Sequence, residues 1–280
     1  MSKARRRGSS EHSRPDVTPE PRVETLPIGA FRVHLVEEAT LERPAAQFFR
    51  GASQADLAAS GLADANVTLS FQPAIVETPA GLVLLDAGVG AGIGEGDTPL
   101  VRALRRLGRD PADVTDVVLS HCHTDHAAGL LDGDGRPLFS GATLHLFQAE
   151  WEHWQAVDAF GEESPHAVEF RRAVLAHPGP TARHADEVEV APGISLIPAP
   201  GHTPGHAAVG LRSGGQALVW AADAFHHPLH LRRHAWHYEN DHDPAQTAST
   251  RATLLGRARA DGARLCAYHF PFPGVVDPPA

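Results

Sequence analysis

The hydrophobic residues of this chain gather in short apolar runs, separated by segments rich in glycine and proline. Runs of this kind are typical of β-strands buried in a sheet. They predict strands at 31–36, 67–77, 82–86, 113–120, 142–147, 194–197, 207–211, 217–220 and 264–268. The turn-rich segment Thr78–Gly81 joins the second and third of these strands, which we expect to pair.

Helical spacing appears between the strands. Residues 99–107 place Leu100, Leu104 and Leu107 on one face, as an amphipathic helix does. Further helical segments are predicted at 148–157, at 162–176 and from Asp243–Pro244 to Ala260, and a helical or irregular segment at 45–62. Strands outnumber helices and the two kinds alternate, which favours a layered α/β body with mixed sheets.

The first 22 residues are rich in Ser, Pro, Arg and Glu, a composition typical of a disordered segment. This tail holds six basic and three acidic residues, a net charge of +3, so the rest of the chain carries −13 of the total of −10. We expect residues 23–280 to form a single domain, because they contain neither a repeat nor a linker.

Composition narrows the function classes. A hydrophobic content of 42% and a charged content of 21% fit an ordinary globular protein, and no run approaches the ~18 apolar residues of a membrane span. The basic start lacks the apolar segment of a secretory signal, which favours a cytoplasmic protein. The acidic body argues against nucleic acid as the main partner.

The most informative segment, 121–126, reads His-Cys-His-Thr-Asp-His and follows an apolar run. His121 and His123 alternate at the end of the predicted strand, so their side chains can point to one side. Asp125 and His126 follow where the chain turns, and can reach a second ion. The segment predicts a site for two divalent ions, with Zn²⁺ expected and Mn²⁺, Fe²⁺ or Co²⁺ as alternatives. Its cysteine should lie buried on the opposite face rather than bind metal.

Four further strands end in a residue that can bind or orient a metal ligand. These residues are Asp86, His202, Asp223 and His269. Polar groups at the ends of neighbouring strands converge on one edge of a sheet. A lone histidine after a strand is more often a surface residue, but five such segments in one chain favour a site.

With these residues the chain resembles the metallo-β-lactamase superfamily, whose signature is a His-x-His-x-Asp-His cluster followed by His, Asp and His at later strand ends. The resemblance covers roughly residues 65–275. It implies an α/β fold, a four-layer αββα sandwich with the metals at one edge between the sheets. It assigns His121, His123 and His202 to one ion, Asp125, His126 and His269 to the other, and Asp223 to both. Asp86 would orient one of these ligands.

Hydrolysis is the chemistry that such a site implies. Two divalent ions about 3.5–4 Å apart can share a hydroxide that attacks a carbonyl or phosphoryl centre, while an ion stabilises the oxyanion. Asp125 can accept a hydrogen bond from the nucleophile and steer its proton. No serine or cysteine nucleophile is then required.

Two stretches, 143–154 and 269–274, are similar to the group of methyl parathion hydrolase and its lactonase and esterase relatives. This resemblance implies a small, partly hydrophobic ester, lactone or phosphotriester as substrate. It also raises the expectation of a homodimer, because such relatives often dimerise. Two alternatives remain open: a mononuclear-iron oxidoreductase similar to persulfide dioxygenases, and a non-catalytic ligand sensor.

His226 departs from the lactonase pattern, in which a tyrosine usually stands three residues after the bridging aspartate. It is either a hydrogen-bond donor to the oxyanion or a solvent-exposed loop residue. The histidine-rich run 226–237 is predicted to be a mobile loop near the pocket mouth. His206 is expected to contact a ligand or a loop rather than bind metal.

Aromatic residues near these segments are candidates for the wall of an apolar substrate pocket. They are Trp151, Trp154, Phe225, Trp236, Phe270 and Phe272. For Trp151 and Trp154, packing of the 148–157 helix in the core is an equally good interpretation.

Overall fold

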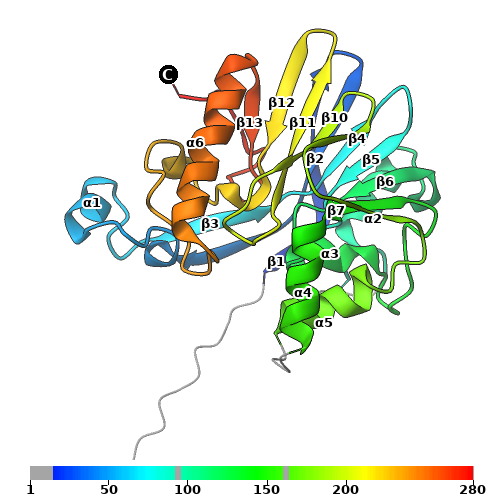
Figure 1. Cartoon of the computed structure of the whole chain (residues 1–280), viewed down its shortest axis with the longest axis horizontal. Helices are drawn as coiled ribbons and strands as arrows, with labels where there is room; N and C mark the ends of the chain where they lie inside the picture. Colours follow the sequence, from blue (N-terminus) through cyan, green and yellow to red (C-terminus); the bar gives the residue numbers. More distant parts are fainter. Residues whose placement is uncertain (1–14, 92–95, 160–163, 280) are drawn as a thin grey trace, which may run out of the picture.

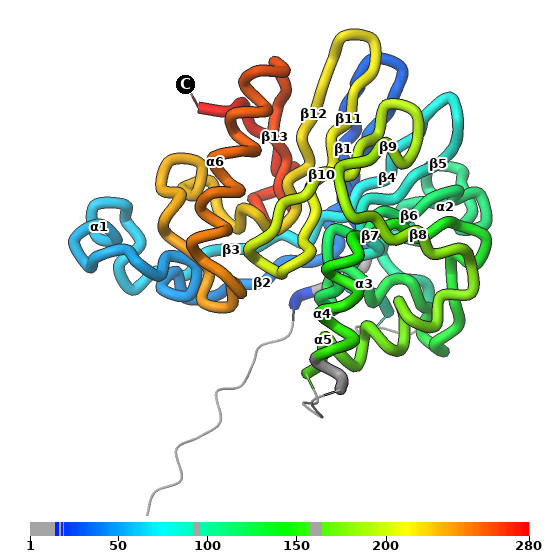
Figure 2. Tube along the Cα trace, in the orientation of Figure 1, coloured from blue at the N-terminus to red at the C-terminus, as the bar shows by residue number. Residues whose placement is uncertain are grey.

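The computed structural model describes residues 15–91, 96–159 and 164–279. Two β-sheets lie face to face in this structure, with helices on their outer sides (Figure 1). The Cα trace shows the same layering, with the C-terminal strands and α6 on one side and α2 to α5 on the other (Figure 2). The predicted αββα sandwich is therefore confirmed.

The first sheet combines an antiparallel half with a parallel half. Its strands, in spatial order, are β1 (Asp16–Ile28), β2 (Phe31–Pro44), β4 (Ala74–Glu77), β5 (Leu82–Leu85), β6 (Val114–Val118), β7 (Thr143–Phe147) and β8 (Thr181–His184). The strand β3 (Asn66–Phe71) pairs with the far half of β2. From β5 to β8 all pairings are parallel, so β5, β6 and β7 end at the same edge.

The second sheet is mostly antiparallel. Its order is β14 (Val275–Val276), β13 (Arg264–Cys266), β12 (Gln216–Trp220), β11 (Ala207–Ser213), β10 (Ile194–Pro198) and β9 (Val188–Ala191). Only the pairing of β12 with β13 is parallel among these strands of the described chain, so both end at one edge. This edge faces the carboxyl ends of β5 and β6 across the sandwich, because residues after the strands of one sheet contact residues after the strands of the other.

Helices cover both outer faces. The first sheet carries α2 (Pro99–Arg106), the short α3 (Thr124–Ala127), α4 (Gln148–Ala159) and α5 (Pro165–Glu169), which continues into a π-helical turn over Phe170–Val174. The second sheet carries α6 (Pro244–Ala260), whose N-terminus is capped by the Asp243 side chain. A further helix, α1 (Gln54–Ala59), lies beside β3 at one end of the molecule (Figure 1).

Alternation along the strands explains the layers. In β5, Val83 and Leu85 belong to the core between the two sheets, whereas Leu82 and Leu84 pack with the helices outside. A third apolar cluster joins β12 and β13 to Leu254, Leu255 and Ala258 of α6. Because side chains point alternately to opposite faces of a strand, a strand that is apolar throughout needs cover on both sides.

The predicted boundary of the disordered tail at residue 22 is wrong. The strand β1 begins at Asp16 and pairs with β2, and the Arg22 guanidinium lies 2.9 Å from the Glu37 carboxylate. An edge strand of this kind is stabilised by backbone hydrogen bonds, so its polar composition conceals it. The rest of the predicted tail, residues 1–14, lies outside the described residues.

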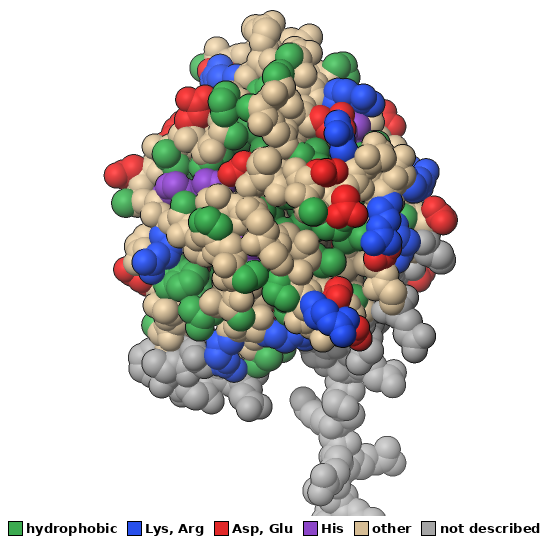
Figure 3. Space-filling view, turned by 90° about the vertical axis from the view of Figure 1, so that its right-hand side faces the viewer, with side chains coloured by type: hydrophobic (Ala, Val, Ile, Leu, Met, Phe, Trp, Pro, Cys, Tyr) green, Lys and Arg blue, Asp and Glu red, His purple; other side chains and the backbone are tan. Residues whose placement is uncertain are grey.

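Two observations bear on the expected partners. No helix in the described ranges is both long and apolar enough to cross a membrane. On the face shown in Figure 3, acidic and basic side chains are interspersed rather than sorted into one basic patch.

Candidate metal centre

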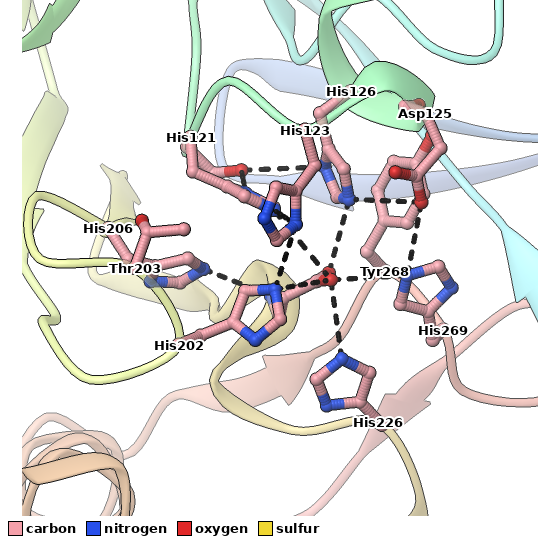
Figure 4. A network of polar contacts seen from close by, with 12 residues as sticks. His121, His123, Asp125, His126, His202, Thr203, His206, His226, Tyr268 and His269 are labelled. Carbon is pink, nitrogen blue, oxygen red and sulfur yellow. Dashed lines mark hydrogen bonds and ion pairs between the residues drawn. The ribbon is translucent and has the colours of Figure 1, made fainter. Parts of the chain in front are cut away.

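The candidate site lies where strands of both sheets end. His121 and His123 follow β6 of the first sheet, whereas His202, Asp223 and His269 follow β10, β12 and β13 of the second. The labelled histidines and Asp125 point toward one common region (Figure 4). The structure thus brings together all seven of the ligands that the family resemblance assigned.

Three imidazoles form the first ligand group. Nitrogen atoms of His121, His123 and His202 lie within 4.8 Å of one another. His123 Nδ1 is 2.9 Å from His121 Nε2 and 3.1 Å from His202 Nε2. Three converging ring nitrogens of this kind are a common ligand set for a borderline divalent ion.

Asp125, His126 and His269 form the second group. Asp125 Oδ2 lies 3.4 Å from the Nε2 atoms of both histidines. Asp223 lies between the groups: its Oδ2 is 3.2 Å from His269 Nε2 and 3.5 Å from His202 Nε2. Its carboxylate would therefore be within reach of an ion held by either group.

The chemistry of these groups fits a pair of divalent cations. His126 Nε2 and Asp223 Oδ1 are buried and have no hydrogen-bond partner among the described residues, although the two atoms lie 3.4 Å apart. Buried polar atoms without a partner destabilise a fold. Cations bound to both groups would satisfy these atoms and compensate the buried carboxylates.

Protonation states support the same interpretation. Burial lowers the pKa of His121 and of His123 well below the usual value, so both imidazoles are neutral and can bind metal. Burial also opposes the charge on His269, but Asp223 and Asp125 outweigh it and raise the pKa of His269 to about 9. In the metal-free protein the His269 ring is therefore protonated and balances the charge of the neighbouring carboxylates, and metal binding would release this proton.

Two carboxylates hold ligand imidazoles by their second nitrogen. Asp86 accepts hydrogen bonds from Ser120 N at 2.7 Å and from His126 Nδ1 at 2.5 Å. Its backbone has a φ of 59°, a strained value for a residue other than glycine. Asp241 accepts from His202 Nδ1 at 2.8 Å. Such contacts fix the tautomer and the orientation of a ligand.

His206 acts on the backbone of a ligand segment. Its Nε2 accepts a hydrogen bond from Asp223 N at 3.2 Å, and its Nδ1 lies 3.0 Å from Ala199 O, to which it donates. This contact positions the loop that carries Asp223, and the structure therefore places His206 outside the ligand groups.

Glu150 of α4, which the sequence analysis did not single out, links three parts of the site. Its carboxylate accepts hydrogen bonds from Cys122 N, Trp154 Nε1, Thr203 Oγ1 and Gly205 N. The Cys122 side chain itself is buried outside the ligand groups, as expected. The one sequence signal for Glu150 is an acidic residue directly before Trp151 in the segment after an apolar strand.

A cavity of about 760 Å³ opens over the ligands. Its floor includes His123, Asp125, Asp223 and His269. Apolar side chains form much of the wall, among them Leu41, Phe48, Leu69, Phe71, Val89 and Trp154. Such a cavity can hold a small ligand with an apolar portion.

Only one of the six predicted wall residues, Trp154, lines this cavity. The other five lie outside the lining, contrary to expectation: Trp151, Phe225, Trp236, Phe270 and Phe272. Trp151 packs against Phe170, with ring centroids 5.4 Å apart, because it lies on another side of α4. Phe225 and Phe270 are buried under α6, and Trp236 packs against Phe49. The Arg22 guanidinium covers Phe272.

The exposed-loop interpretation of His226 is wrong. This residue is 3% exposed, and its Nε2 lies 3.4 Å from Asp223 Oδ2. Burial lowers the pKa of His226 to about 4, so the ring is neutral. The predicted mobile loop also contains a 3₁₀ helix at Pro228–Leu231, and His230 Nε2 in it donates to Phe48 O at 2.8 Å. These contacts tie the segment to Phe48, in the loop after β2.

Comparisons with known proteins agree with this geometry. A probable metallo-hydrolase of Mycobacterium tuberculosis is 30% identical over 183 residues, which are 55% of this chain and 56% of the relative. An N-acyl homoserine lactonase of Bacillus cereus is 28% identical over 43% of this chain and 42% of its own length. The chain thus spans between about two fifths and just over half of the length of these curated relatives.

Solved structures extend the likeness to most of the fold. The dizinc quorum-quenching lactonase AidC, solved with a product, N-hexanoyl-L-homoserine, superposes with a TM-score of 0.78 at 21% identity, over 91% of this chain and 92% of that one. The hydrolase AbOPH gives a TM-score of 0.77 at 23% identity with the same coverage. The family model of the metallo-β-lactamase superfamily matches residues 74–269, a range that holds all seven ligands. The chain belongs to the metallo-β-lactamase superfamily.

Proposed function

We propose that this protein is a metal-dependent hydrolase that cleaves an ester, lactone or phosphotriester bond in a small, partly hydrophobic molecule. One observation carries the proposal. Seven ligand side chains form two groups with Asp223 between them, and five of the seven line a cavity of about 760 Å³. The proposed cofactor is a pair of divalent ions, with zinc expected because imidazole and carboxylate ligands suit it.

His121, His123 and His202 would hold one ion, and Asp125, His126 and His269 the other, with Asp223 between them. When bound, two divalent ions acidify a water molecule and stabilise negative charge on the oxygen of a scissile bond. The protein residues then need only to hold the substrate, orient the water and exclude bulk solvent.

Asp125 is the residue best placed to orient the water. Its side chain is 26% exposed, whereas the Asp223 side chain is 3% exposed. Asp125 also lines the cavity, so a carboxylate oxygen is accessible to a water molecule or substrate there. A carboxylate in this position accepts a hydrogen bond from the water and guides its proton toward the leaving group.

His226 is the proposed donor to the substrate oxygen that gains charge. Its neutral ring lines the cavity, and it stacks on His269 with ring centroids 5.4 Å apart. Nε2 is the ring nitrogen that faces the ligands, and a proton there could be donated to an oxyanion. This would give His226 the function that a tyrosine has in lactonases of the family.

The cavity supports the proposed substrate class. Its apolar wall favours a hydrophobic substituent, and its metal-facing floor favours a polar, scissile bond. Relatives named N-acyl homoserine lactonases are, as their name says, enzymes for molecules of this kind. An acyl lactone is therefore the first substrate to test, before aryl esters and phosphotriesters.

The test measures turnover of acyl lactones, aryl esters and a paraoxon-type triester by zinc-loaded protein, with and without chelator. We expect chelator-sensitive hydrolysis of at least one substrate, about two zinc ions per chain, and loss of activity in Asp223→Asn. Turnover of none of them by the fully loaded protein would overturn the proposal. One bound iron together with oxygen uptake on a persulfide would favour the oxidoreductase instead.

A further inference from the structure

His166 is a cavity residue outside both ligand groups. It lies in the first turn of α5 and contributes to the cavity wall. Its ring lies over the ring of the ligand His123, with centroids 4.2 Å apart and an angle of 33° between the planes. Trp154, which also lines the cavity, meets the His166 ring edge-on at 5.9 Å. A histidine so close to the floor of the site is within reach of a bound substrate.

The hydrogen bonds of His166 define its tautomer. Its Nδ1 lies 3.0 Å from Thr124 N and 3.1 Å from Thr124 Oγ1. A backbone N–H can only donate, so Nδ1 must be the unprotonated, accepting nitrogen. The ring is therefore neutral, and its single proton is on Nε2.

The Nε2–H group of His166 has no acceptor within the described part of the chain. Two other neutral imidazoles near the site, His206 and His230, have both nitrogens engaged. In His206, Nε2 accepts from Asp223 N and Nδ1 contacts Ala199 O, and in His230, Nδ1 accepts from His226 N and Nε2 donates to Phe48 O. The Nε2–H group of His166, a residue of the cavity wall, is thus a donor without a partner among the described residues.

We propose that His166 is a substrate-binding residue whose Nε2–H donates to a carbonyl oxygen of the substrate outside the scissile bond. This inference rests on the proposed function and adds a determinant of substrate choice to it. His166 lies over His123 of the first ligand group, whereas His226 lies over His269 of the second. Two donors on different sides of the floor can hold a molecule with two carbonyl groups, such as a lactone bearing an acylamino substituent.

Two substitutions of His166 separate its Nε2–H donor from its Nδ1 acceptor, which holds Thr124 N. The side-chain amide of Asn reaches the position of Nδ1, and that of Gln reaches the position of Nε2. His166→Asn can keep the acceptor for Thr124 N but loses the donor to the cavity. His166→Gln keeps a donor toward the cavity but loses the acceptor. His153→Asn is the matched control, because His153 also lines the cavity and contacts Trp154, yet stacks on no ligand.

The substrates are an N-acyl-α-amino-γ-butyrolactone and a γ-alkyl-γ-butyrolactone of the same chain length, which lacks the amide. For His166→Asn we expect KM for the amide lactone to rise about 3- to 10-fold with kcat nearly unchanged, as loss of one neutral hydrogen bond predicts. KM for the alkyl lactone should not change. His166→Gln and His153→Asn should keep the wild-type ratio of the two KM values.

Binding of the ring-opened products, measured by calorimetry on zinc-loaded protein, provides a readout that does not depend on turnover. The amide-bearing product should bind His166→Asn about 3- to 10-fold more weakly than wild type, and the other product equally well. This holds even if neither lactone is hydrolysed, an outcome that would count against the proposed function alone. Equal losses for both products, or no loss for either, at unchanged zinc content, would show that His166 only supports the fold.

Discussion

At the scale of single residues, the site depends on what holds the second nitrogen of each ligand histidine. Asp86 holds His126, Asp241 holds His202, and Ser70 O lies 2.9 Å from His269 Nδ1. An imidazole fixed at one nitrogen presents the other in a constant direction. Metal affinity should therefore depend on residues that never touch the ion.

Replacing Asp241 by Asn should weaken zinc binding about 10- to 100-fold. The carboxylate accepts from both His202 Nδ1 and Tyr238 N, and an amide must turn its NH₂ group toward one of these donors. Chelator competition measures the effect. Asp243→Asn is the control, because this exposed cap of α6 is served equally well by Asn. Unchanged affinity in Asp241→Asn would argue against orientation by this contact.

The ligands could be predicted from the sequence because their signal is local: a metal-binding residue type directly after an apolar strand. Asp241 could not, since it follows no strand, and Glu150 could not, since it lies inside the helix after β7; each acts through a partner distant in sequence. The prediction of an aromatic cavity wall was wrong for a related reason. Trp151 and Trp154 are three residues apart on α4, and only the packing of that helix decides that Trp154 faces the cavity.

At the scale of elements, α4 connects the two halves of the site through Glu150. The helix follows β7 of the first sheet, yet its carboxylate accepts from Thr203 and Gly205 of the second half. Gly205 is required at this contact, since a Cβ there would lie 2.0 Å from Glu150 N. Docking of α4 and placement of the His202 loop are therefore one event.

Glu150→Gln should lower the free energy of unfolding by about 2–4 kcal/mol, because the new NH₂ group faces two donors that have lost their acceptor. Denaturant unfolding measures this loss. The control is Glu152→Gln, an exposed position on the same helix, where the change should stay within about 0.5 kcal/mol. Equal stability of the two variants would contradict the proposed connecting role.

Glu38 of β2 is a second buried carboxylate that connects separate elements of the fold. Its buried carboxylate accepts from Val89 N at 2.8 Å and from Leu100 N at 3.0 Å, and so joins β2 to the loop after β5 and to α2. Burial raises the pKa of Glu38 to about 8, although both backbone donors favour the charged form. The folded protein therefore binds a proton that the unfolded chain has released.

This shift gives a prediction for stability against pH. The raised pKa means that Glu38 lowers the free energy of unfolding as pH rises from about 4.5 to about 8, by an amount on the order of 3–5 kcal/mol. Glu38→Gln should remove this dependence on pH. The free energy of unfolding of the variant should therefore rise relative to that of the wild type as pH increases from about 4.5 to about 8. Urea unfolding at several pH values checks it, with Glu42→Gln, an exposed residue of β2, as control. Parallel curves for Glu38→Gln and wild type would refute the prediction.

Most strands and helices could be predicted because their apolar residues are periodic or continuous. The strands β1, β8, β9 and β14 were not, since they lie at the edges of the sheets and are short or carry many polar residues. Their place depends on a neighbour with free backbone groups, which a local pattern does not reveal. The same limit explains why the predicted tail extended into β1.

At the scale of the whole molecule, each ligand group takes residues from both sheets. The first combines His121 and His123 with His202, and the second combines Asp125 and His126 with His269. Bound ions would thus crosslink the two halves of the sandwich, and their binding energy would add to the stability of the fold.

Removal of metal should therefore lower the melting temperature by about 5–10 °C, the change expected for a ligand present at a hundredfold excess over its Kd. Calorimetric scans of zinc-loaded and chelator-treated protein measure the difference, and added zinc should restore it. In Asp223→Asn the difference should shrink, because the residue shared by both groups is altered. An unchanged melting temperature after verified metal removal would contradict the crosslink.

The order of the ligands along the chain has a consequence for biosynthesis. The three imidazoles of the first group have all been translated by residue 202, but His269 leaves the ribosome only after β13 has been made. A nascent chain stalled between these points would hold one complete ligand group and one that lacks a member. Cotranslational capture of metal should accordingly proceed in two steps, the second waiting for the last strands of the sandwich.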